Sequence, residues 1–147
     1  MKSIMIVCPN ATDATSFYRG VGPLSYLKRS MPEINLTFVN EVNWASLSMV
    51  DLVFMQRPYD DYHVKIAEMC KVNRKPLWID YDDDLFAVPF SNPAFHVYMN
   101  AKTSNNIEKV CKNADVISVS TSELIKSYKP YNKNIQVIPN ALDLESL

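Results

Sequence analysis

The stretch that decides the fold runs from residue 51 to residue 79 and reads DLVFMQRPYDDYHVKIAEMCKVNRKPLWI. It opens on an expected strand at residues 51–55, which is apolar from Leu52 onward, as is typical of a strand buried on both faces. Apolar side chains then recur with helical spacing over residues 62–70, and Pro76 precedes a second apolar run at residues 77–79. Two short strands joined by one helix predict a βαβ unit, in which the two strands run parallel.

The same alternation continues in both directions along the chain. We expect strands at residues 4–8, 36–39, 51–55, 77–79, 116–119 and 135–138. We expect helices within residues 17–31, 62–73, 107–114 and 120–128. Ser120 and Glu123 have the spacing of a capping box for the last of these helices. The pattern predicts one α/β domain over residues 1–147, a Rossmann-like open, mainly parallel sheet of about six strands with helices on both faces.

Composition excludes several classes of protein. Fifteen Lys and Arg nearly balance sixteen Asp and Glu, so a net charge of −1 gives no general attraction to nucleic acid or to an anionic membrane. No apolar run approaches the roughly 20 residues of a transmembrane helix. Cys8, Cys70 and Cys111 lie far apart, and His63 and His96 are the only histidines. We therefore expect no disulfide framework and no zinc site, and a cytoplasmic location.

The glycines exclude the usual nucleotide-binding loops. Gly20 and Gly22 are the only two glycines, and they lie about twelve residues beyond the first expected strand. A dinucleotide fingerprint needs glycine in the turn directly after that strand, where the backbone approaches a pyrophosphate. Neither a P-loop nor the nucleophile elbow of an α/β-hydrolase occurs in the sequence.

Ligands of parallel α/β sheets bind beyond the carboxyl ends of the strands, and an acidic run follows the fourth expected strand. Residues 80–84 read DYDDD, with four carboxylates in five positions. Such a run can serve as a general base, as a clamp for ligand hydroxyl groups or as a divalent cation site. The alternative is a solvated acidic turn that caps a short helix at Leu85.

Two arginines and one histidine supply further candidates. Arg19, next to Gly20 and Gly22, is expected near a helix start, where it would form an anion or phosphate site with the backbone N–H groups. The alternative is an ordinary surface arginine ahead of a helix that has Pro23 in its first turn.

Arg57 follows the third expected strand. It either lines the same cleft as Arg19 or forms a structural ion pair with Asp82 or Asp83, and the ion pair is the preferred interpretation. His96 is a candidate acid–base group, with a structural role as the alternative.

Two segments resemble the end of the N-terminal domain of GT-B glycosyltransferases of the large retaining family four. Residues 113–124, NADVISVSTSEL, and residues 135–143, IQVIPNALD, are similar to that family's consecutive motifs. Tyr18-Arg19 and the run DDDLFAVP at residues 82–89 resemble a subgroup seen in bacterial and phage genomes. The similarity is collinear over almost the whole chain, and Pro139-Asn140 is its most specific part.

The resemblance implies one half of a two-domain enzyme that moves a sugar from a nucleotide-sugar to an acceptor. In this family the N-terminal domain mostly holds the acceptor, which would be a glycan, a lipid or another small molecule. The C-terminal domain holds the donor and carries a Glu-x7-Glu motif. We expect that domain to be missing here, and to be supplied by a partner chain or a longer protein. The 147 residues alone are then expected to bind no cofactor and to be nearly inactive.

Site roles follow from the resemblance together with its departures. Many family members carry a His just after the fourth strand, where Asp80 and Asp82 stand here, and we expect these two to be catalytic groups at sugar or acceptor hydroxyls. Arg19, Gly20, Gly22, Arg57, Asp83, Asp84 and His96 are expected to bind substrate, with Asn140 at the interdomain hinge. Ala141-Leu142 replaces the family's Gly-Val, and its Gly-Gly near the first strand is missing. These enzymes need no bound metal, so none is expected.

Two other classes remain open. A non-catalytic binding or assembly module would reuse the fold and bury a protein partner on exposed aromatic side chains, for which Tyr59, Tyr62, Tyr98 and Tyr131 are the candidates. A receiver-like signalling domain would bind Mg²⁺ at acidic strand ends, but its acidic pair should follow the first strand, where Pro9-Asn10 stand.

Overall fold

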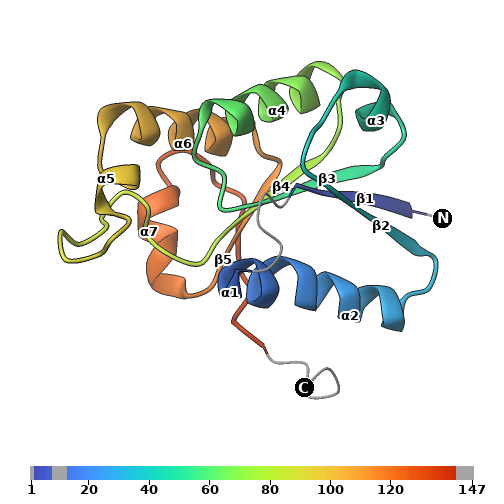
Figure 1. Ribbon diagram of the computed structural model, residues 1–147, viewed down its shortest axis with the longest axis horizontal. Coiled ribbons are helices and arrows are strands. Elements are labelled where there is room, and N and C mark those ends of the chain that lie inside the picture. Colours follow the sequence, from blue (N-terminus) through green and yellow to red (C-terminus); the bar gives the residue numbers. More distant parts are fainter. Residues whose placement is uncertain (1, 8–12, 142–147) are drawn as a thin grey trace.

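The fold is built on one six-stranded sheet in which every strand runs parallel to its neighbours, and this confirms the predicted fold class (Figure 1). The computed structural model describes residues 2–7 and 13–141. The strands are β1 (Lys2–Val7), β2 (Ile34–Val39), β3 (Leu52–Gln56), β4 (Leu77–Tyr81), β5 (Val116–Val119) and β6 (Ile135–Val137). Their spatial order is β2-β1-β3-β4-β5-β6, so the direction of strand addition reverses between β1 and β3.

Helices cover both faces of the sheet, as predicted. One face carries a continuous helical segment made of α1 (Ala14–Ser16), the π-helical turn η1 (Phe17–Val21) and α2 (Gly22–Ser30). The opposite face carries α4 (Asp61–Val72) and α6 (Ala101–Asn113), which pack side by side. Shorter elements complete the fold, namely α3 (Trp44–Ser48), α5 (Phe95–Tyr98), the 3-10 turn η2 (Ser122–Leu124) and α7 (Ile125–Tyr128).

Strand alternation divides the core into two layers. Met55 and Ile79 point to the α4–α6 layer, where they join the larger apolar cluster. Phe54 points to the α2 layer and joins Ile6 and Leu24 in the smaller one. The four central strands have both faces covered and read as near-continuous apolar runs. The edge strands β2 and β6 include polar residues and are more exposed.

The first helix begins earlier than the sequence predicts. Asp13 caps it, because its Oδ1 accepts a 2.7 Å hydrogen bond from the Ser16 N–H. Arg19 and Gly20 therefore lie inside the helical segment, and their expected place at a helix start was wrong. α2 itself begins at Gly22 with Pro23 in its first turn, as predicted. The Gly22 N–H donates to the Phe17 carbonyl five residues earlier, which widens the turn ahead of Pro23.

Two further local predictions were also wrong. The Ser120 hydroxyl forms no capping box but donates to the Asp82 carbonyl at 2.9 Å, and Thr121 is the N-cap of the next turn, without a side-chain bond. No helix follows the acidic run at Leu85, which lies in an irregular segment.

The predicted aromatic contact patch is not exposed. Tyr98 is buried, and Tyr59, Tyr62 and Tyr131 are half-buried.

Some predictions concern residues outside those described, and others can be stated only for the described part. Cys8, at the end of the first expected strand, and Leu142 and Asp143 of the family motif lie outside it. None of the helices in residues 2–7 and 13–141 combines the length and apolarity that crossing a bilayer requires.

Candidate functional site

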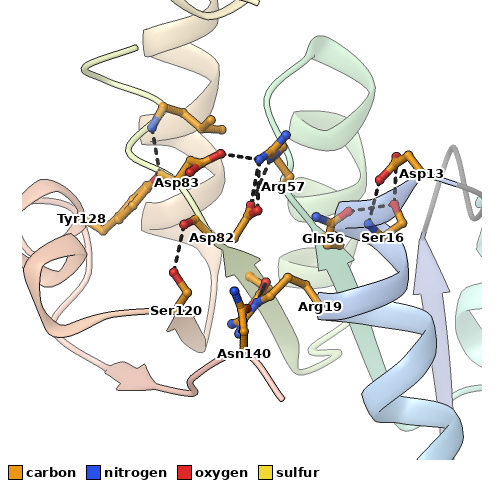
Figure 2. Close-up of polar contacts among 12 residues, drawn as sticks. Asp13, Ser16, Arg19, Gln56, Arg57, Asp82, Asp83, Ser120, Tyr128 and Asn140 are labelled. Atoms are coloured by element: carbon orange, nitrogen blue, oxygen red, sulfur yellow. Dashed lines mark hydrogen bonds and ion pairs between the residues drawn. The ribbon is translucent and has the colours of Figure 1, made fainter. Parts of the chain in front are cut away.

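The carboxyl ends of the strands gather most of the predicted site residues at one edge of the sheet. We call this group the carboxyl-edge rim, and Figure 2 shows most of it. Its members are Asp13, Ser16, Arg19, Gln56, Arg57, Asp80, Asp82, Asp83, Asp84, Ser118, Ser120 and Asn140. They lie at the carboxyl ends of β3, β4 and β5 or in the segments that follow β1, β3, β4, β5 and β6, as expected when parallel strands end at the same edge.

Arg19 and Asp80 form a buried ion pair within the rim. The guanidinium contacts both carboxylate oxygens, with Nε 3.0 Å from Oδ2 and Nη2 2.5 Å from Oδ1. Arg19 is 7% exposed and Asp80 is 1% exposed. The contact joins the first helical segment to the end of β4, across 61 residues of sequence. A fork of this kind fixes the orientation of both planar groups.

The Asp80 carboxylate has a second side-chain partner, which ties β5 into the same network. The Ser118 hydroxyl donates to Asp80 Oδ1 at 2.5 Å, and the Trp78 indole N–H donates to the Ser118 hydroxyl at 2.7 Å. Asp80 is thus buried and bonded on both oxygens, while the Asp82 carboxylate is 17% exposed. Of the two carboxylates predicted to be catalytic, Asp82 is the one that a ligand at the rim can reach.

Arg19 also holds the segment that follows β6. Its Nη1 donates to the Ile138 carbonyl at 2.5 Å and to Asn140 Oδ1 at 3.2 Å. The structure therefore brings together Arg19, Asp80 and Asn140, which the sequence analysis chose from three distant segments. The Arg19 guanidinium therefore fixes the orientation of the Asp80 carboxylate and also the direction in which the chain leaves the sheet.

The predicted ion pair of Arg57 is confirmed. Its Nη2 lies 3.1 Å from Asp82 Oδ2 and 2.6 Å from Asp83 Oδ2, and its Nε lies 3.2 Å from Asp82 Oδ1. The Arg57 backbone has φ 51°, a left-handed conformation that is uncommon outside glycine. Burial raises the pKa of Asp82 and the negative charge of Asp83 adds to the effect, while Arg57 opposes it.

The acidic run is an ordered turn and not merely a solvated one. The Tyr128 hydroxyl donates to the Asp83 carbonyl at 2.7 Å. Asp84 accepts a hydrogen bond from the Phe86 N–H at 3.0 Å and another from the Ser127 hydroxyl at 2.5 Å. These contacts hold the backbone of the turn against α7 and leave the Asp83 carboxylate at the surface.

A cavity of about 180 Å³ opens beside this turn. It is lined by Arg57, Asp83 and Asp84 on its polar side, by Val88 and Pro89 on its apolar side, and by Tyr98. Acceptors, a donor and an apolar wall therefore meet in one small space. That mixture suits a ligand bearing both hydroxyl groups and C–H surface.

Sequence reasoning missed a polar cluster between β3 and the first helix. The Ser16 hydroxyl lies 3.1 Å from Gln56 Oε1 and 3.1 Å from Asp13 Oδ2. Gln56 is 6% exposed, and its Nε2 has no hydrogen-bond partner among the described residues. The available signal was a single polar side chain ending an otherwise apolar strand, at the point where strand order reverses.

Other predicted site residues lie apart from the rim's contacts. His96 is exposed on α5, where its ring packs against Phe90 and Phe95. Gly20 and Gly22 lie inside the helical segment, and a Cβ on Gly20 would meet the ring of Phe54. Within the described residues, no three His, Cys, Asp or Glu side chains come together as a metal-ligand set.

The charge of the rim is strongly unbalanced. It holds five carboxylates, from Asp13, Asp80 and residues 82–84, against the guanidiniums of Arg19 and Arg57. Both guanidiniums are engaged by carboxylates. No family model, no curated protein and no solved structure matches the chain.

Proposed function

We propose that this chain is the acceptor-side domain of a GT-B glycosyltransferase, of the family that the segments at residues 113–124 and 135–143 resemble. In that enzyme a sugar passes from a nucleotide-sugar to an acceptor, and the donor is held by a second domain outside these 147 residues. A six-stranded parallel sheet with its polar rim at the carboxyl edge is consistent with this role.

The observation that supports the proposal most strongly is the double use of Arg19. It binds Asp80 inside the rim, and it also binds the Ile138 carbonyl and Asn140. The resemblance places the passage to the donor domain at Pro139-Asn140. An enzyme that closes two domains around its substrates needs the start of that passage to be fixed relative to the acceptor site.

Within the rim we assign contact with the acceptor to Asp82 and a positioning role to Asp80. Asp82 is partly exposed, and its raised pKa suits a group that accepts a hydrogen bond, and then a proton, from the attacking hydroxyl. Arg57 fixes the orientation of that carboxylate. The negative rim would also stabilise positive charge that develops at the anomeric carbon.

The test is a transfer assay with labelled UDP- and GDP-sugars, on the 147 residues alone and on the protein joined to its donor domain. The DNA downstream of codon 147 is sequenced first, and a frame encoding Glu-x7-Glu would supply that domain. We expect transfer only when the two domains are joined. In the joined protein Asp82→Asn should lower kcat/KM by about 10²–10⁴-fold, as expected for lost proton transfer. Asp61→Asn is the matched control, because Asp61 pairs with Lys102 on the surface.

Two outcomes would contradict the proposal. One is a joined protein that folds, binds nucleotide-sugar and transfers nothing to any glycan, lipid or small-molecule acceptor. The other is an Asp82→Asn variant that is as active as the Asp61→Asn control.

A further inference from the structure

We infer that Gln56 is a ligand-binding residue, and that the rim's ligand is a neutral, hydroxyl-rich group such as a sugar ring rather than a phosphate. This inference rests on the proposed function and deepens it, because it names the chemical class that the acceptor presents to the domain.

Gln56 is buried without all of its hydrogen bonds. Its Nε2 has no partner among the described residues, although the side chain is only 6% exposed. Burying an unpaired amide is unfavourable, so such a group calls for an explanation, and a missing ligand provides one. The other side of the amide is held, because Oε1 lies 3.1 Å from the Ser16 hydroxyl.

The unpaired atom does not depend on which way the amide is turned. The Ser16 hydroxyl has one hydrogen, and Asp13 Oδ2 also lies 3.1 Å from its oxygen. If Ser16 donates to Asp13, a turned amide can donate to Ser16 through Nε2, and Oε1 is then unpaired. In either orientation one polar atom of Gln56 remains for a ligand. A hydroxyl group serves both cases, since it donates and accepts.

Gln56 lies where ligands of this fold class bind. It ends β3, next to the reversal of strand order between β1 and β3, and it is paired in register with Asp80 of β4. Figure 2 shows its amide between the Asp13–Ser16 contact on one side and the Arg57–Asp82 pair on the other. A ligand bonded to Gln56 would therefore meet carboxylates on both sides.

The charged groups around Gln56 favour a neutral ligand over an anionic one. The rim has five carboxylates and two guanidiniums, and the guanidiniums are already paired with Asp80, Asp82 and Asp83. A diphosphate would bring like charge to this surface, where both guanidiniums of the described rim residues are already paired. Sugar hydroxyls can instead donate to the carboxylates while they satisfy the Gln56 amide. The predicted anion site at Arg19 does not fit this arrangement, because Asp80 occupies its guanidinium.

The experiment uses side-chain amide signals in ¹H–¹⁵N NMR spectra of the 147-residue protein. The sequence contains only two glutamines, Gln56 and Gln136, and Gln136 is exposed on β6. Gln56→Met identifies the Gln56 signals by their loss, and Gln136→Met is the matched control. The probes are methyl glycosides of glucose, galactose, mannose and N-acetylglucosamine at millimolar concentrations, with pyrophosphate as the charged counterpart.

We expect at least one glycoside to shift the Gln56 amide signals in a saturable way, with a dissociation constant in the millimolar range that suits one sugar ring. Binding should weaken at least tenfold in Gln56→Met, and it should persist in Gln136→Met. Gln56→Met should melt at the same temperature as the wild type or higher, because an unpaired buried amide has been removed. A clear loss of stability would indicate a purely structural glutamine and would overturn the assignment.

Two further results would also overturn it. One is a wild-type protein in which no glycoside moves the Gln56 signals. The other is saturable binding of pyrophosphate at Gln56, which would leave a glycosyltransferase possible but refute a neutral ligand. Failure of the proposed function gives a different pattern, with glycoside binding at Gln56 and no transfer in the joined protein.

Discussion

The buried Arg19–Asp80 pair should contribute far more to stability than an exposed ion pair with the same shortest N–O distance in the same protein. Its side chains are 3% and 2% exposed, whereas those of Lys102 and Asp61, also 2.5 Å apart, are 73% and 66% exposed. Arg19→Met leaves the Asp80 carboxylate buried, with the Ser118 hydroxyl as its remaining side-chain partner. We expect this change to lower the free energy of unfolding by about 3–5 kcal/mol. Lys102→Met should cost less than ~1 kcal/mol.

The measurement is urea unfolding followed by circular dichroism, arranged as two double-mutant cycles. Arg19→Met combined with Asp80→Leu should recover part of the loss, because the buried charge is gone, and should give a coupling of about 1–3 kcal/mol. The cycle on Lys102 and Asp61 should give about 0.5 kcal/mol or less.

Native domains have roughly 5–15 kcal/mol of stability, so Arg19→Met can fail to fold. Arg19→Lys keeps the charge without the fork and serves as the milder variant. Equal costs for the buried and exposed pairs would refute the reasoning.

Three further predictions concern the helix, the acidic turn and the thiols. A Cβ on Gly22 would lie 2.7 Å from a backbone carbonyl oxygen, so Gly22→Ala should destabilise by about 1–3 kcal/mol in urea unfolding. Gly20→Ala should be neutral or stabilise by up to ~1 kcal/mol through helix propensity.

The pKa of Asp82 is raised from 3.8, so protonation favours the folded state, and the resulting stability is lost as pH rises through the raised value. The stability of Asp82→Asn relative to wild type should therefore increase with pH across that window, and a decrease would contradict the cause given. Burial raises the pKa values of Cys70 and Cys111 to about 12, so a disulfide reagent at pH 8 should modify both only as fast as the protein unfolds.

The sheet could be predicted from sequence because both of its faces are covered. The central strands then read as short, mainly apolar runs, and the helical segments between successive strands favour parallel pairing. The edge that holds the site follows from the same argument, and so did the contact of Arg57 with Asp82 and Asp83. These features depend on local pattern and on a rule that applies to every parallel sheet.

The bonds inside the site could not be predicted in the same way. Arg19 and Asp80 are 61 residues apart, and their pairing depends on how deeply the first helical segment lies over β4. The helix start was predicted too late because Asp13, six residues before Arg19, is the N-cap. The π-helical turn at residues 17–21 then joins this first turn to α2, which begins at Gly22. Ser120 was assigned to a cap because its spacing fits, although a carbonyl of the acidic turn offers it a tertiary partner.

Titration calorimetry on the 147-residue protein tests the central claim most directly, namely that its rim receives a neutral acceptor while the donor is held elsewhere. The protein is titrated with UDP-glucose, GDP-mannose and the methyl glycoside that shifts the Gln56 signals. We predict measurable binding of the glycoside, weakened in Gln56→Met, and no binding of either nucleotide-sugar at the same concentrations. Tight binding of a nucleotide-sugar to these residues alone would contradict the account.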